Sequence, residues 1–165
     1  MKTAIYAGTF DMPTVGHQWM IETGAKLFDK LIVAIGTNPA KKTMFSVPER
    51  LRMLFAILPA RDGVVMHSYE NKLLVHCARE MGASYILRGI RDQVDANYER
   101  QMQLINSEIA PEIETIFLMP PANIAQVSSS IVKGLIGVEG WEEVVKKYLP
   151  SPIWEQVIAK HRTAK

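Results

Sequence analysis

Four segments of the chain combine glycine, hydroxyl and cationic residues in ways that suit phosphate binding. The first, Gly8-Thr9-Phe10-Asp11-Met12-Pro13-Thr14-Val15-Gly16-His17, leads from an apolar run into a helical pattern. Glycine lets the backbone approach a ligand closely, and a helix N-terminus presents free N–H groups to an anion. His17 stands at that N-terminus, where a ring N–H can donate to a phosphate oxygen. On spacing alone, a strand–helix turn capped by Thr14 or Asp11 explains the segment equally well, because it matches neither GxGxxG nor a P-loop.

Three further segments of this kind follow other apolar runs. They are Asn38-Pro39-Ala40-Lys41-Lys42-Thr43-Met44-Phe45, then Arg88-Gly89-Ile90-Arg91 with Asp95, Tyr98 and Glu99 after it, and Ser128-Ser129-Ser130. Guanidinium forks match phosphate oxygens, so the two arginines form a plausible clamp. Ordinary explanations exist for each: solvated lysines, surface arginines paired with Asp92 and Asp95, and serines that cap a helix. Together the four segments predict a polyanion site, most simply for a nucleoside triphosphate.

Short apolar runs alternate with helical patterns along most of the chain, and this alternation predicts how the four segments are positioned. The expected strands are Thr3–Tyr6, Leu31–Ile35, Val64–His67, Tyr85–Leu87 and Thr115–Leu118. Most show little polar alternation, which is typical of parallel strands buried on both faces. The pattern predicts an α/β fold with a Rossmann-like, doubly wound parallel sheet of five strands. Ligands of such sheets bind beyond the carboxyl ends of the strands.

The segments between the strands show helical spacing of apolar residues. The predicted buried faces are Met20, Gly24, Leu27 and Phe28 in the first, Leu51, Leu54, Phe55 and Leu58 in the second, and Leu73, Leu74, Cys77, Ala78 and Met81 in the third. Ser46 and Glu49 predict a capping box at the start of the second, with Pro48 in its first turn. From about Ser128 onward the pattern is helical, and Pro150 and Pro152 break it before a last helix near Ile153–Lys160. We expect a single domain, residues 1–165, with an α/β core over 1–127 and a C-terminal helical part over 128–165.

Composition and charge exclude several classes of protein. The 165 residues are 48% hydrophobic and 22% charged, which is typical of one globular domain. Lys and Arg number 19 and Asp and Glu 17, and this slight excess gives no general electrostatic case for nucleic acid or membrane binding. The single cysteine, Cys77, excludes an intramolecular disulfide and suits a reducing compartment. No run of 18 apolar residues and no signal-peptide core is present, so we expect a cytoplasmic protein.

These residues resemble the phosphopantetheine adenylyltransferase family, of the nucleotidyltransferase superfamily with the (H/T)xGH signature. Thr14-Val15-Gly16-His17 carries that signature, preceded by Gly8-Thr9-Phe10-Asp11. The more specific motifs are Lys41-Lys42-x-Met44-Phe45, Arg88-Gly89-Ile90-Arg91-x-x-x-Asp95-x-x-Tyr98-Glu99-x-Gln101, Asn106 with Pro111-Glu112-Ile113-Glu114, Phe117-Leu118-Met119-Pro120 and Ser128-Ser129-Ser130-x-Val132-Lys133. The resemblance covers essentially residues 2–150. The chain differs from the family's usual residues at Ala7, Met12, Ala96, Asn97 and Ser107. These differences leave its choice of acceptor open.

The resemblance implies transfer of the adenylyl group of ATP to 4′-phosphopantetheine, giving dephospho-coenzyme A and pyrophosphate in coenzyme A biosynthesis. The acceptor phosphate would attack the α-phosphorus in line, without a general base because it is already anionic. Mg²⁺ is expected with ATP, bridging phosphates and waters more than protein carboxylates. A homohexamer is also implied, with coenzyme A as a candidate feedback ligand. Two alternatives stay open: a nucleotidyltransferase with a different phosphorylated acceptor, and a non-catalytic nucleotide-sensing protein.

The resemblance also assigns roles to individual residues. The catalytic residues would be Thr9, His17, Lys41 and Arg91, with His17 stabilising the transition state and Thr9 and Lys41 orienting the attacking phosphate. The acceptor would be bound by Thr9, Lys41, Leu74, Arg88, Met102 and Asn106. ATP would be bound by Thr9, Phe10, His17, Gly89, Ile90, Arg91, Glu99, Ile124, Ala125, Gln126, Val127, Ser128, Ser129 and Ser130. No protein residue is expected to bind a metal, and we interpret His67, His76 and His161 as structural or solvent-facing.

Overall fold

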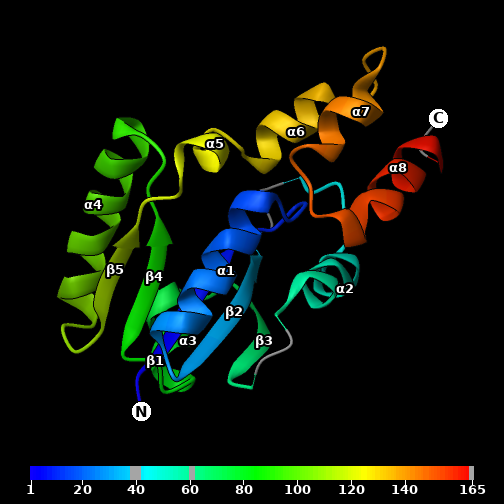
Figure 1. Cartoon of the computed structure of the whole chain (residues 1–165). Coiled ribbons are helices and arrows are strands. Elements are labelled where there is room, and N and C mark those ends of the chain that lie inside the picture. The colour runs from blue at the N-terminus through cyan, green and yellow to red at the C-terminus, as the bar shows by residue number, and fades with distance from the viewer. Residues whose placement is uncertain (38–41, 60–61, 164–165) are drawn as a thin grey trace.

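A single parallel sheet forms the centre of the structure, a computed structural model that describes residues 1–37, 42–59 and 62–163 (Figure 1). Its strands run in the order β3-β2-β1-β4-β5. They are β1 (Thr3–Gly8), β2 (Lys30–Thr37), β3 (Val64–Glu70), β4 (Tyr85–Gly89) and β5 (Glu114–Leu118). The prediction of a five-stranded parallel sheet is therefore confirmed. Because the chain winds outward from β1 on one side and then returns to β4 on the other, the crevice beyond β1 and β4 is the expected ligand site.

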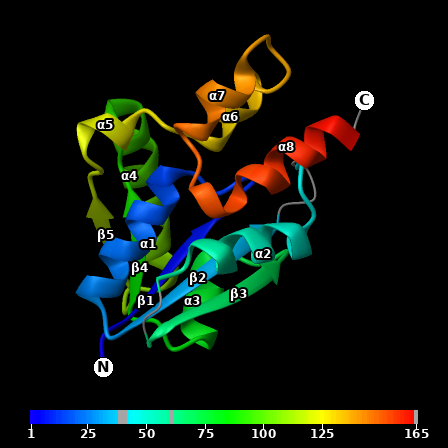
Figure 2. The ribbon, with the colours of Figure 1, turned by 45° about the vertical axis from the view of Figure 1, so that its right-hand side comes forward.

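Helices cover both faces of the sheet. They are α1 (Val15–Leu27), α2 (Val47–Ile57), α3 (Leu74–Glu80), α4 (Gln93–Ile109), α5 (Ala122–Ala125), α6 (Ser129–Leu135), α7 (Trp141–Lys146) and α8 (Trp154–Thr163), with a 3₁₀ turn at Ser151–Ile153. Helices α5 to α8 extend across the carboxyl end of the sheet (Figure 2). Pro150 precedes the 3₁₀ turn and Pro152 lies within it, so the predicted break before the last helix is confirmed.

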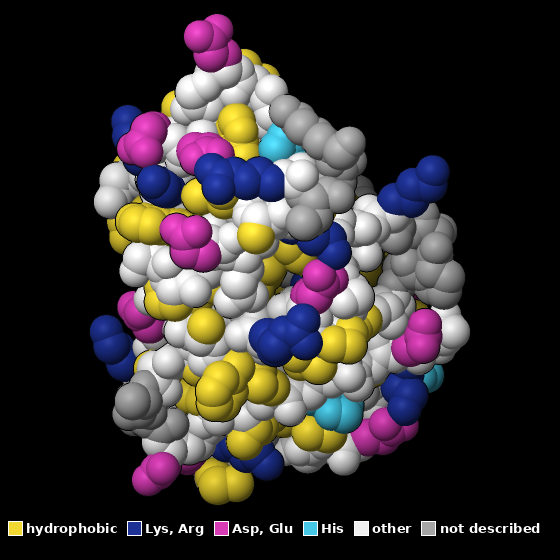
Figure 3. All heavy atoms as spheres, turned by 90° about the vertical axis from the view of Figure 1, so that its right-hand side faces the viewer, with side chains coloured by type: hydrophobic (Ala, Val, Ile, Leu, Met, Phe, Trp, Pro, Cys, Tyr) yellow, Lys and Arg dark blue, Asp and Glu magenta, His cyan; other side chains and the backbone are white. Residues whose placement is uncertain are grey.

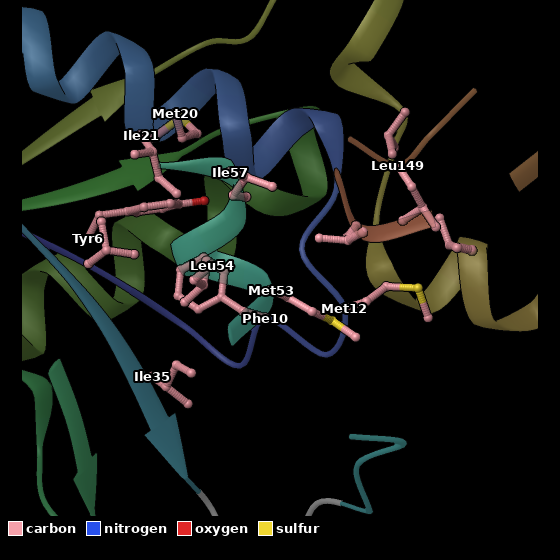
Figure 4. Close-up of a cluster of buried hydrophobic side chains, with 14 of the residues drawn as sticks. Tyr6, Phe10, Met12, Met20, Ile21, Ile35, Met53, Leu54, Ile57 and Leu149 are labelled. Atoms are coloured by element: carbon pink, nitrogen blue, oxygen red, sulfur yellow. The ribbon is translucent and has the colours of Figure 1, made fainter. Parts of the chain in front are cut away.

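The strands divide the core into two clusters because successive side chains point to opposite faces. Ala4 and Tyr6 of β1 pack with buried side chains of α1, α2 and the C-terminal helices, and Figure 4 shows part of this cluster. Ile5 and Ala7 pack on the other face with α3. Both faces are buried, which explains why these strands read as continuous apolar runs in the sequence.

The helix faces differ in part from those predicted. In α2 the buried residues are Arg50, Met53, Leu54 and Ile57. Phe55, predicted to be buried, is 71% exposed, and Leu27 and Leu73 are also exposed, at 52% and 53%. Spacing alone allows two overlapping apolar stripes on α2, and the sheet contacts the one that contains Met53 and Ile57. Leu27 is wrongly predicted because it ends α1, and Leu73 because it precedes α3.

Other local predictions are confirmed. Ser46 and Glu49 form the capping box that opens α2, and Cys77 is buried on α3. The face formed by α2, β3 and α8 carries interspersed charges of both signs (Figure 3). No helix among the described residues is long and apolar enough to cross a membrane.

Candidate active site

A cavity of about 510 Å³ lies at the carboxyl ends of β1 and β4. The structure brings into its wall residues from all four segments singled out in the sequence, Lys42 and Thr43 representing the second. The candidate site residues that line it are Thr9, Phe10, His17, Arg88, Gly89, Arg91, Glu99, Ile124, Val127, Ser128, Ser129 and Ser130. The wall thus carries cationic, hydroxyl and glycine residues together, which suits a polyanionic ligand.

Six candidate residues are not among those that line the cavity. Ile90 follows β4 and donates its N–H to the Leu118 carbonyl, and the others are Leu74 on α3, Met102 and Asn106 on α4, and Ala125 and Gln126 at the end of α5. Lys41 lies outside the described residues.

His17 is fixed at the start of α1 by a reciprocal capping arrangement. Thr14 is the N-cap: its hydroxyl accepts from the His17 N–H, and its own backbone N–H donates to His17 Nδ1 at 3.0 Å. An atom that accepts a hydrogen bond from a backbone N–H carries no proton, so the neutral ring must hold its proton on Nε2. Of the two candidate caps predicted for this turn, Thr14 is confirmed and Asp11 is not.

The electrostatic environment keeps the His17 imidazole neutral. Removal from water, and then the positive charge of Arg91, lower the pKa of His17 to about 4. At neutral pH the ring is therefore an Nε2–H donor without a full charge, and it lines the cavity. Such a donor can stabilise negative charge on a phosphoryl oxygen without requiring a proton from solution.

This gives a prediction for the titration of His17. We expect ¹⁵N NMR of the imidazole to show the Nε2–H tautomer at pH 7 and a midpoint near 4, against the ordinary value of about 6.5. Because the unfolded chain binds this proton more readily, His17 should lower the free energy of unfolding as the pH falls from about 6.5 towards 4. A midpoint close to 6.5 would contradict the assigned environment.

Phe10 has an unusual backbone at the edge of the cavity. Its φ of 48° lies in the left-handed region, which is unfavourable for a bulky residue by about 1–2 kcal/mol. Its ring is only 1% exposed and makes edge contacts with Tyr6 and His17, with centroid distances of 5.5 and 5.0 Å. Burial of this ring between the two neighbours offsets the backbone strain and fixes the loop beside His17.

The α1 N-terminus offers fewer free N–H groups than the sequence suggested. The Val15 N–H donates to the Tyr148 carbonyl from the C-terminal part of the chain, at 3.0 Å, and the His17 N–H is taken by Thr14. An anion in the cavity would therefore depend on side chains more than on this helix end.

Two arginines of the cavity wall are paired with carboxylates from α4. Arg88 holds Glu99 with two hydrogen bonds, Nε to Oε2 being 2.7 Å, and donates to the Ala7 carbonyl from Nη1 at 3.0 Å. Arg91 holds Asp95 in the same bidentate manner, and this hydrogen bond lowers the pKa of Asp95. The surface pairing of Arg91 with Asp95 that the sequence left open is therefore present, while both arginines also line the cavity.

The serine segment closes another side of the cavity. Ser128 is the N-cap of α6, its hydroxyl accepting from the Ile131 N–H at 3.2 Å. Ser129 donates to the Met12 carbonyl at 2.7 Å. Helix capping is thus confirmed for Ser128, and Ser129 ties α6 to the loop that follows β1.

The cavity wall also contains three residues that were not among the predicted site residues: Tyr6, Asp11 and Lys133. Tyr6 is only 8% exposed, and burial raises its pKa. Asp11 and Lys133 form an ion pair at 2.9 Å between the β1 loop and α6. The sequence marked Asp11 within the Gly8–Asp11 element and Lys133 at the end of the Ser128–Lys133 motif, whereas it did not mark Tyr6.

Within the described part of the chain, no group of three or more His, Cys, Asp or Glu residues is arranged to hold a metal ion. The carboxylates of the cavity wall, Asp11, Asp95 and Glu99, each face a cationic side chain. A divalent cation would therefore fit here only as part of a phosphate complex, with phosphate and water as its ligands.

Comparison with known proteins identifies a family and a shared fold. Residues 5–135 match the model of the cytidylyltransferase-like family. The phosphopantetheine adenylyltransferase of Neisseria meningitidis serogroup B is 51% identical over 98% of this chain and 95% of that protein. That of Chromobacterium violaceum is 48% identical over 98% of each chain. The structure of Plasmodium falciparum nicotinic acid mononucleotide adenylyltransferase complexed with NaAD has a TM-score of 0.65 at 18% identity, with 93% of each chain covered, and shares the fold.

Proposed function

The chain belongs to the phosphopantetheine adenylyltransferase family, and we propose on this premise that it transfers the adenylyl group of ATP to 4′-phosphopantetheine. The products are dephospho-coenzyme A and pyrophosphate, so the enzyme acts in coenzyme A biosynthesis. The observation that carries the proposal is the cavity in which His17, Arg88 and Arg91 meet at the carboxyl ends of β1 and β4. These are the groups that a reaction between two polyanions requires.

In the proposed reaction, a phosphate oxygen of the acceptor attacks the α-phosphorus of ATP in line. A bond forms from that oxygen to the α-phosphorus, and the bond from the α-phosphorus to the bridging oxygen of pyrophosphate breaks. The nucleophile is already anionic, so no side chain has to remove a proton. His17 donates its Nε2–H to the transferred phosphoryl group, and Arg91 adds positive charge beside it.

We assign the acceptor phosphate to Thr9, Lys41 and Arg88. Thr9 and Arg88 line the cavity, and so does Lys42, the neighbour of Lys41. Leu74, Met102 and Asn106, which lie outside the cavity wall, would contact the pantetheine arm beyond the phosphate. We assign ATP to Phe10, Gly89, Ile90, Arg91, Glu99 and the segment 124–130. Mg²⁺ enters with ATP, as the MgATP complex.

We also propose that the protein forms a homohexamer and functions in the cytoplasm as a single nucleotidyltransferase domain. Helix α4 supports an oligomer, because it exposes several large apolar side chains that a partner subunit would cover. They are Val94, Tyr98, Leu104, Ile105 and Ile109, exposed by 37% to 79%.

An acceptor panel tests the proposed activity. With MgATP, we expect pyrophosphate release with 4′-phosphopantetheine and only background release with nicotinate mononucleotide or glycerol 3-phosphate. Preferred turnover of either of those acceptors would assign a different nucleotidyl transfer. Thermal stabilisation by ATP without turnover of any acceptor would identify a nucleotide-sensing protein instead. Wild-type protein and His17→Ala are compared in the same assay.

A further inference from the structure

Asp11 is a buried carboxylate that binds a segment distant in the sequence. Its side chain is almost inaccessible, the residue being 2% exposed. Oδ2 accepts from the Met44 N–H and Oδ1 from the Phe45 N–H, both at 2.9 Å. Two consecutive N–H groups thus converge on the two oxygens of one carboxylate. A carboxylate suits this arrangement because each of its two oxygens can accept one of the N–H groups.

The segment that Asp11 binds leads directly into the cavity. Lys42 and Thr43, immediately before Met44, line the cavity wall. On the other side, Phe45 is 2% exposed, and α2 begins behind it with the Ser46–Glu49 capping box. Asp11 therefore fixes the segment that places Lys42 and Thr43 in the cavity wall.

Asp11 is also joined to the other walls of the cavity. Lys133 Nζ of α6 lies 2.9 Å from Oδ2. Arg50 of α2, only 3% exposed, donates to the Thr9 carbonyl at 2.7 Å, and the negative charge of Asp11 acts on this guanidinium. The carboxylate thus interacts with cations of two other elements, Lys133 of α6 and Arg50 of α2.

We propose that Asp11 is a positioning residue for the acceptor side of the reaction. Its carboxylate holds Met44 and Phe45 against the loop that carries Thr9 and leads into α1. It thereby sets the distance between the acceptor phosphate and the groups that act on the α-phosphorus. This inference rests on the proposed function. Asp11 lines the cavity but is only 2% exposed, and both of its oxygens are taken by Met44 and Phe45, so we assign its effect to these two residues.

The position of the segment that contains Lys42 and Thr43 should affect turnover more than ATP binding. A displacement of about 1 Å between reacting groups can lower the rate by about 10²-fold. Most residues assigned to ATP, by contrast, belong to β4, α4 and the segment 124–130, and among the described residues no hydrogen bond joins Gly89, Arg91 or the serine segment to Met44 or Phe45. Loss of Asp11 should therefore lower kcat and raise KM for the acceptor while Kd for ATP changes little.

Asp11→Asn tests this difference between turnover and ATP binding, because asparagine has nearly the same shape as aspartate but only one acceptor oxygen. We expect kcat to fall about 10–100-fold and KM for 4′-phosphopantetheine to rise, while Kd for ATP changes by less than about threefold. Hydrogen exchange should become faster at residues 42–46 and stay unchanged in β1. Asp29→Asn is the matched control, because Asp29 also accepts a backbone N–H, from Lys2 at 2.6 Å, at the opposite end of the sheet. It should leave all of these values unchanged.

Two outcomes would overturn the proposal. One is an Asp11→Asn protein whose kcat and acceptor KM stay within twofold of wild type. The other is an equal loss of ATP and acceptor binding together with faster exchange throughout the sheet, which would indicate a purely structural role.

A second variant covers the case in which Asp11→Asn does not fold. In Asp11→Ala, formate can occupy the place of the missing carboxylate, and we expect it to raise kcat severalfold, whereas chloride at equal ionic strength should not. Formate that leaves kcat unchanged would contradict the proposal. In the wild-type protein, the Met44 and Phe45 amides should exchange at least about 10-fold more slowly than in an unstructured chain. Exchange at the unstructured rate would refute the anchoring without any substrate, whereas failure of wild-type turnover would refute only the proposed function.

Discussion

His17→Ala is expected to lower kcat at least about 10²-fold while KM for both substrates changes little. This magnitude is that of a lost hydrogen-bond donor to charge that develops in the transition state. The neutral Nε2–H of His17, fixed by Thr14 at Nδ1, supplies such a donor. The measurement is the initial rate of pyrophosphate release over a range of both substrate concentrations.

The alanine variant also loses part of the α1 cap, so stability has to be separated from catalysis. Removal of the ring leaves the Thr14 N–H without the partner it now has at 3.0 Å, which should cost about 0.5–2 kcal/mol. His17→Gln keeps this cap, because glutamine at the third helical position is the usual capping-box partner. We expect it to restore the thermal midpoint but not kcat. Near-wild-type turnover in either variant would remove His17 from the proposed catalytic role, and His76→Ala, on the exposed side of α3, is the control.

Much of the fold was predictable because strands buried on both faces form continuous apolar runs, which are easy to recognise in the sequence. All five strands were identified, yet β1 and β4 extend to Gly8 and Gly89, beyond the apolar residues that marked them. The residues missed are Ala7 and Gly8 of β1 and Arg88 and Gly89 of β4. A small side chain, an absent one or a cation gives little indication of a buried strand. Helix α5 was missed for a similar reason: it spans only Ala122–Ala125 and has no side-chain cap.

The site was predictable in its chemistry but not in its pairings. The residue types and their places after strands pointed to the segments that line the cavity. The bond from Phe45 to Asp11 joins residues 34 apart, and that from Arg88 to Glu99 joins residues 11 apart across β4 and α4. Such partners depend on the packing of separate elements, and no local spacing encodes them. The histidine in the capping box was missed because glutamate or glutamine is the usual residue at that position.

Arg88→Met should have the second large effect, on acceptor binding. Arg88 lines the cavity and we assign it to the acceptor phosphate, so its loss removes a positively charged donor. We expect KM for 4′-phosphopantetheine to rise about 100-fold, since each hydrogen bond to a charged group contributes about 1.5–3 kcal/mol. Titration calorimetry with the acceptor measures this directly, and the Kd for ATP serves as the internal comparison.

The same substitution leaves Glu99 buried without the guanidinium that now pairs with it. The side chain of Glu99 is 9% exposed and that of Arg88 is 27% exposed. Breaking a buried pair from one side costs about 3–5 kcal/mol, and the partial exposure of Arg88 places this case towards the lower end. The double variant Arg88→Met with Glu99→Gln removes the uncompensated charge. It should recover most of the thermal midpoint while acceptor binding stays weak, because the phosphate partner is still absent. Arg79→Met, which breaks a half-exposed pair with Glu112, is the control and should leave KM unchanged. If the double variant regained acceptor binding along with stability, Arg88 would act only as the structural partner of Glu99.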